Sequence, residues 1–91
     1  MITFEDYKKR VFELAMKTAF KGLSEKEVLE YFKREEKYIL DMYESATNPD
    51  LYKKLYENTP NFEKRFKKFK NGDYLESNIS GTVGGLDMMW Q

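Results

Sequence analysis

The sequence contains neither cysteine nor histidine among its 91 residues. Without cysteine the chain forms no disulfide and offers no thiolate nucleophile, and such a composition suits a reducing compartment. Without histidine it also lacks the commonest general base and, with both residue types missing, the ligands of ordinary zinc sites. We therefore expect a protein that holds no metal and no cofactor.

Long apolar runs are also absent, and charged residues follow the initial methionine within a few positions: Glu5, Asp6, Lys8, Lys9 and Arg10. This pattern predicts neither a signal peptide nor a membrane span. Apolar residues make up 41% and charged residues 35% of the chain, a balance typical of globular proteins. We therefore expect a cytoplasmic protein that does not bind membranes.

Strand signals are scarce, since no segment alternates apolar and polar residues up to a hairpin turn. Helix-start signals are frequent instead. Capping-box patterns begin at Thr3, Ser24 and Asp73, and capping residues precede proline at Asn48 and Thr59. Helical spacing of apolar residues predicts helices over 4–21, 25–46, 51–56, 62–70 and 73–91, the second with a bend near 33–37. The sequence thus predicts a single all-α domain over residues 1–91, a compact bundle of four to five short amphipathic helices.

The strongest local signal for function is a basic helix over residues 62–70. It interleaves three phenylalanines with five cations: Lys64, Arg65, Lys67, Lys68 and Lys70. Over 51–72 there are seven basic residues and two acidic ones, whereas 73–91 holds three acidic residues and no basic one, so a net charge of zero conceals a charge dipole. Such a helix fits the phosphates of a nucleic acid or an acidic groove of a protein. It also fits a solvated outer face with phenylalanines in the core, the interpretation we favour from the sequence alone.

The last predicted helix carries a group of small residues: Ser77, Gly81, Gly84 and Gly85. Residues this small let another backbone approach closely, so we expect them to pack against a neighbouring helix. The alternative is self-association of the chain through this face. Three apolar residues at the end of the segment are candidate anchors for a partner: Met88, Met89 and Trp90.

Carboxylates supply the remaining candidates for chemistry. The pairs Glu27 with Glu30 and Asp73 with Glu76 stand at helix starts, where capping and the helix dipole already account for acidic residues. We therefore expect no enzymatic activity.

Three segments are characteristic of the sequence: the helix start MITF (1–4), the turn GLSE (22–25) and the closing GGLDMMW (84–90). In these segments and in its general character the chain resembles small accessory proteins of bacterial phages and mobile elements, with no specific family identified. The resemblance implies a protein that binds and inhibits or adapts a host protein, as anti-CRISPR inhibitors do. We therefore expect a small accessory or regulatory domain that binds a protein, with nucleic-acid binding through the basic helix as the alternative. Homo-oligomerisation is left open.

Overall fold

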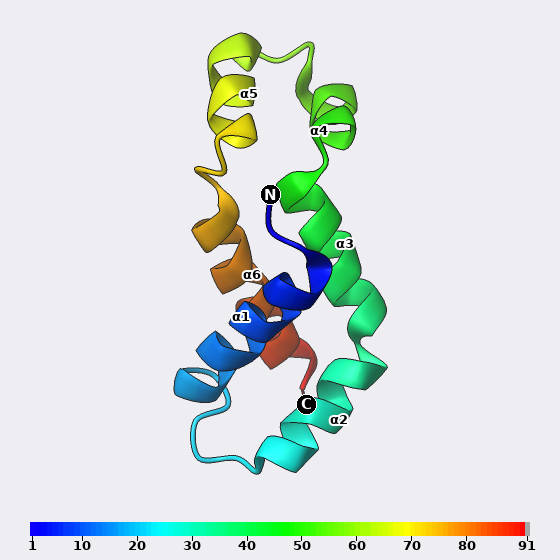
Figure 1. Cartoon of the computed structure of the whole chain (residues 1–91), viewed down its shortest axis with the longest axis vertical. Coiled ribbons are helices and arrows are strands. Elements are labelled where there is room, and N and C mark those ends of the chain that lie inside the picture. The colour runs from blue at the N-terminus through cyan, green and yellow to red at the C-terminus, as the bar shows by residue number, and fades with distance from the viewer. Residues whose placement is uncertain (91) are drawn as a thin grey trace.

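The computed structural model describes residues 1–90, and this part of the chain forms six α-helices and no strand (Figure 1). They are α1 (Phe4–Lys17), α2 (Glu25–Arg34), α3 (Glu36–Thr47), α4 (Pro49–Tyr56), α5 (Phe62–Lys70) and α6 (Leu75–Met89). The all-α bundle predicted from the sequence is confirmed. Helices α1, α2, α3 and α6 form a helical body, and α4 and α5 form a hairpin at one end of the molecule, which we call the α4–α5 arm.

The bundle is elongated, with principal extents of 43 × 20 × 19 Å. Its radius of gyration is 14.4 Å, whereas a compact domain of this length would have one of about 12 Å. The arm accounts for the excess, because α3 is the only helix of the body that α4 and α5 contact (Figure 1).

Two predicted helix starts are confirmed together with their capping hydrogen bonds. The Thr3 hydroxyl accepts from the Asp6 amide at 3.1 Å and begins α1. The Asn48 side chain accepts from the amides of Asp50 and Leu51 at 3.0 and 3.2 Å and begins α4 at a proline. Each cap satisfies amides that the first turn of a helix leaves without a partner.

Two other predicted starts are wrong. The Thr59 hydroxyl donates to the Tyr56 carbonyl at 2.6 Å, so it closes the end of α4 instead of capping α5. Helix α5 begins after Asn61, whose φ of 58° lies in the left-handed region that asparagine tolerates. Helix α6 begins after Tyr74, one residue beyond the expected cap Asp73. Short capping patterns of this kind occur in turns as well as at helix starts.

The helix expected over 25–46 is divided at Glu35, where the bend was predicted. This break is why there are six helices instead of four or five. Helix α1 also ends earlier than expected, at Lys17, because the following turn places Phe20 in the core with 1% of its surface exposed. Gly22 has a φ of 86° and supplies the left-handed turn predicted there, further along the chain than the helix end itself.

The core of the body gathers side chains from α1, α2, α3, α6 and the turn after α1: Tyr7, Val11, Ala15, Phe20, Val28, Tyr31, Phe32, Ile39, Ala46, Ile79, Val83 and Leu86. Each large apolar side chain removed from water contributes about 1.5–3 kcal/mol to folding. The aromatic excess of the sequence is thus largely absorbed by packing. Phe20, for example, meets Tyr31 edge-on at a ring separation of 6.0 Å.

A short polar network crosses this core. The Asn78 side chain on α6 donates to the Tyr7 hydroxyl and to the Met42 carbonyl, both at 2.7 Å, and so ties α6 to α1 and α3. The Tyr7 hydroxyl lies 2.9 Å from the Thr82 hydroxyl, which donates to the Asn78 carbonyl at 2.8 Å. Thr82 and Tyr7 are fully buried, and burial raises the pKa of the Tyr7 phenol.

Residues 75–89 form the helix predicted for the C-terminal segment, but its small residues do not pack as expected. Ser77, Gly81 and Gly84 are exposed, and a Cβ atom added at either glycine would meet open space. The prediction of close helix packing is therefore wrong at these three positions. At Gly85, in contrast, a Cβ atom would overlap the phenol of Tyr38 on α3.

Candidate functional site

The α4–α5 arm is built around its own aromatic cluster. The ring of Tyr52 on α4 stacks on three phenylalanines of α5, closest to Phe69 at 4.3 Å and an interplanar angle of 25°. Phe69 is buried and yet lies outside the core of the body. The phenylalanines of the basic helix thus face inward, as expected, but into a separate small core.

Arg65, a predicted partner-binding residue, is engaged within the arm. Its Nε and one terminal nitrogen donate to the Pro60 carbonyl at 3.3 and 3.0 Å, and the same terminal nitrogen contacts the Thr59 hydroxyl. The guanidinium also lies 5.9 Å from the centre of the Tyr56 ring. These contacts hold the connection between α4 and α5 and engage Nε and one of the two terminal nitrogens of the guanidinium.

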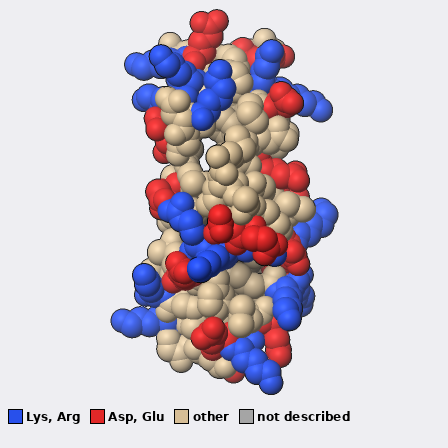
Figure 2. Space-filling model, viewed as in Figure 1, with Lys and Arg blue, Asp and Glu red and all other residues tan. Residues whose placement is uncertain are grey.

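Lys64, Lys67 and Lys68 are exposed, as the prediction required. Lys70 is also exposed, with its ammonium 4.6 Å from the centre of the Phe66 ring. Figure 2 shows basic side chains projecting from both edges of this end of the molecule.

The arm and the body differ in the share of their cations that form ion pairs: within residues 1–90, four of the nine cations of the body do so and none of the seven of the arm. All five ion pairs found within residues 1–90 join residues of the body, and none involves a cation of the arm. Within the part of the chain that the structure describes, the cations of the arm form no direct ion pair, and Asp50, Glu57 and Glu63 leave it a net charge of +4. A cluster of positive charges attracts anionic surfaces over several ångströms.

Apolar groups accompany these cations on the arm. Leu55 is 60% exposed and Tyr56 is 41% exposed, side by side on α4. Between the arm and the body lies a cleft of about 500 Å³, lined in part by Ile2, Ala46 and Leu75 and visible as an opening in Figure 2. The arm thus presents apolar and cationic groups together.

The other predicted anchors lie at the opposite end of the molecule, where α6 ends beside α2 (Figure 1). Met88 is 84% exposed and Met89 is 43% exposed, but Trp90 packs edge-on against Phe20 and Tyr31 at 5.0 and 4.7 Å. The structure therefore separates the predicted binding residues into two surfaces, and Trp90 belongs mainly to the fold.

Four groups of the body have displaced pKa values. Burial raises the pKa of Tyr7, Tyr31 and Tyr38, and a hydrogen bond to Glu5 raises the pKa of Lys8. Within residues 1–90 no three acidic side chains lie close enough to hold a metal ion. None of the helices described is both long and apolar enough to cross a membrane.

The sequence analysis did not identify a pocket between α1, α2 and α3, which is lined in part by Phe12, Leu29 and Phe32. Phe12 and Leu29 fall outside the apolar stripes of their helices, and this was the signal that could have revealed an apolar surface there.

Comparison with models of protein families, with curated proteins and with solved structures finds no match to this chain. The functional argument therefore rests on the geometry of these surfaces.

Proposed function

We propose that this chain is a small non-enzymatic domain that binds another protein, and that its α4–α5 arm docks on an acidic surface of that partner. The observation that carries the proposal is the set of arm cations without ion pairs, on the same arm as the exposed side chains of Leu55 and Tyr56. Protein interfaces combine such aromatic and aliphatic contacts with complementary charge at the rim. An inhibitor of a host protein, such as an anti-CRISPR, is the form of this function that the resemblance in general character suggests.

Nucleic-acid binding through residues 62–70 is the second candidate, favoured by exposed Lys64, Lys67 and Lys68 on one short helix. The geometry favours it less than protein binding. The arm has a single arginine, Arg65, and its guanidinium is held by the α4–α5 connection, so bidentate contacts to phosphates or guanines are not available from it.

The test compares three forms of the tagged full chain as baits in an extract of the organism that encodes it. They are the parent, an arm variant with Lys64, Lys67 and Lys68 changed to Glu, and a control with Lys17, Lys21 and Lys26 changed to Glu. The control lysines are exposed, form no ion pair within residues 1–90 and undergo the same change in charge. Circular dichroism confirms that all three forms are folded.

We expect the parent and the control to retain the same protein and the arm variant to lose it, with an affinity for the purified partner at least about tenfold lower. Equal retention by all three forms would refute the proposal. If the arm variant instead loses a strongly salt-dependent binding to a 20-nucleotide DNA or RNA, and no protein is retained, the second candidate replaces it.

A further inference from the structure

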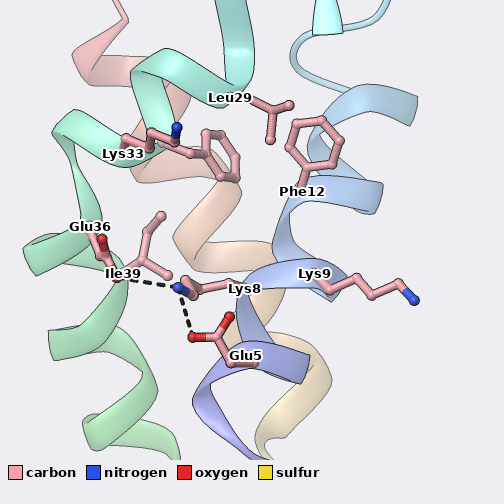
Figure 3. Close-up of a pocket in the computed structure, with 9 residues that line it drawn as sticks. Glu5, Lys8, Lys9, Phe12, Leu29, Lys33, Glu36 and Ile39 are labelled. Carbon is pink, nitrogen blue, oxygen red and sulfur yellow. Dashed lines mark hydrogen bonds and ion pairs between the residues drawn. The ribbon is translucent and has the colours of Figure 1, made fainter. Parts of the chain in front are cut away.

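The pocket between α1, α2 and α3 has a volume of about 350 Å³ and an apolar interior (Figure 3). Its apolar lining comes from all three helices: Phe12, Leu29, Phe32 and Ile39. The rings of Phe12 and Phe32 meet edge-on at 5.6 Å, so the wall between α1 and α2 is well packed. Leu29, one of these lining residues, is 43% exposed. Phe32 and Ile39 are already buried by the fold, at 8% and 0% exposure, so the apolar area that remains open in the pocket is mainly that of Phe12 and Leu29.

The charges around the pocket are arranged unequally. Lys8 on α1 contacts Glu5 at 3.1 Å and Glu36 on α3 at 3.2 Å, so both carboxylates of the lining already share one ammonium. Lys9 and Lys33 form no ion pair within residues 1–90. In Figure 3 the ammonium of Lys33 lies beside the apolar lining, whereas the exposed side chain of Lys9 points away. The free positive charge at the rim is thus on the side of α2.

Apart from the charged side chains at its rim, the lining contains no polar side chain that would orient a small molecule. Small-molecule sites typically occupy about 300–1,000 Å³ and place a few buried polar groups toward the ligand. This pocket is near the lower limit of that range, and no buried side-chain polar atom within residues 1–90 lacks a hydrogen-bond partner. A side chain carried by a partner protein does not need such groups, because its own backbone fixes its orientation.

We propose that this pocket receives a bulky apolar side chain from an acidic segment of the partner protein, with a neighbouring carboxylate of that segment paired to Lys33. The inference rests on the proposed function, since it names a second contact with a protein partner. It identifies the partner by its chemistry, an aromatic or large aliphatic residue flanked by acidic residues. The cation on α2 attracts those acids, and the pocket buries the apolar group.

The experiment titrates the isotope-labelled full chain with three blocked pentapeptides and follows the shifts by nuclear magnetic resonance. The peptides are Glu-Glu-Phe-Glu-Glu, Glu-Glu-Ala-Glu-Glu and Lys-Lys-Phe-Lys-Lys. We expect only the first to bind saturably, with the largest shifts at Phe12, Leu29 and Ile39. Changing Leu29 or Lys33 to Glu should weaken its binding about fivefold or more, because each change puts a carboxylate next to an acidic peptide.

Matched controls separate the pocket from general charge effects. Leu23→Glu and Lys21→Glu, both in the turn between α1 and α2, make the same chemical changes at exposed positions outside the pocket lining, and they should leave the affinity within about twofold. Melting curves establish that Leu29→Glu is folded, as a half-exposed side chain allows. The Lys33 variant keeps the apolar lining intact and provides an independent test.

Three outcomes would overturn the inference: equal binding of the acidic and basic phenylalanine peptides, shifts confined to another surface, or binding of free decanoate with none of the peptide. The arm variant with Lys64, Lys67 and Lys68 changed to Glu should still bind the first peptide. The peptide assay does not need the arm, so it tests the pocket alone. If the pocket proposal is wrong, the peptide does not bind; if the arm proposal is wrong, the arm variant retains the partner protein as well as the parent does.

Discussion

Replacing Tyr7 by phenylalanine tests the polar network that joins α1, α3 and α6. The Thr82 hydroxyl donates to a carbonyl, so its remaining capacity is to accept from the Tyr7 hydroxyl, which in turn accepts from Asn78. Tyr7→Phe therefore removes two hydrogen bonds from a residue with no exposed surface, while the ring that fills the core stays in place. The change leaves one side-chain N–H of Asn78 without its acceptor.

We expect Tyr7→Phe to lower the free energy of unfolding by about 2 kcal/mol. A net hydrogen bond is worth ~1 kcal/mol, and a polar group left unsatisfied in a partly buried site adds ~1–3 kcal/mol, reduced here by access of water to Asn78. For a domain of this size the midpoint of thermal unfolding should fall by about 8–16 °C. Thr82→Val should cost a similar amount, and the double variant should cost less than the sum, because both changes break the same bond.

Urea unfolding followed by circular dichroism measures these differences, with Tyr56→Phe as the matched control. The Tyr56 hydroxyl forms no hydrogen bond within residues 1–90 and its side chain is 41% exposed, so its removal should change stability by less than about 0.5 kcal/mol. Equal losses for the two phenylalanine variants, or strictly additive losses for Tyr7 and Thr82, would refute the network as a stabilising unit.

Three further measurements follow from the structure. Gly84→Ala should raise the free energy of unfolding by up to ~1 kcal/mol, because alanine has the higher helix propensity. Gly85→Ala should not raise it, because the new Cβ atom would displace Tyr38. Equal effects of the two changes in chemical denaturation would contradict the close packing at Gly85. Burial raises the pKa of Tyr7 above its ordinary value of 10.0, so the stability from the neutral phenol is complete below that pH and is lost as the pH rises. The stability gap between the parent and Tyr7→Phe should therefore narrow above about pH 10, and a constant gap in urea titrations would refute this. Arg65→Ala and Arg65→Lys should both speed amide hydrogen exchange in α4 and α5 about fivefold, with exchange in α1 unchanged. If the lysine variant kept the slow exchange of the parent, a positive charge at this position would suffice to hold the α4–α5 connection, and the guanidinium hydrogen bonds would not be needed.

Much of the fold follows from local sequence patterns. Helical spacing located every helical segment, although α2 and α3 were expected as one bent helix, because each amphipathic stripe has to face a core. Helix ends were less predictable. Helix α1 ends at Lys17 because Phe20 gains a place in the core by leaving the helix, and its ring neighbours Tyr31 and Trp90 come from distant parts of the chain. Periodicity within one segment contains no information about that contact.

The candidate binding surfaces were also only partly predictable from the sequence. The basic run over 62–70 is visible in the sequence, but the internal role of Arg65 depends on the connection that precedes α5. The open space at Gly81 and Gly84 was not predictable either, since it depends on which face of α6 meets α1 and α3. The pocket is formed by three helices together, so the sequence of any one segment does not predict it.

The distribution of charge supports a partner on energetic grounds as well. Exposed ion pairs such as those of the body contribute about 0–1 kcal/mol each, so the body gains little from its charges and loses little by them. The arm has seven cations and three acidic residues, Asp50, Glu57 and Glu63, and within residues 1–90 its cations form no ion pair to offset their mutual repulsion. Repulsion of this kind opposes the packing of α4 on α5, which rests on a small aromatic cluster around Tyr52. An acidic surface placed against the arm would remove the repulsion and add attraction, so binding should stabilise the arm itself, and amides of α4 and α5 should exchange more slowly in the complex than in the free chain.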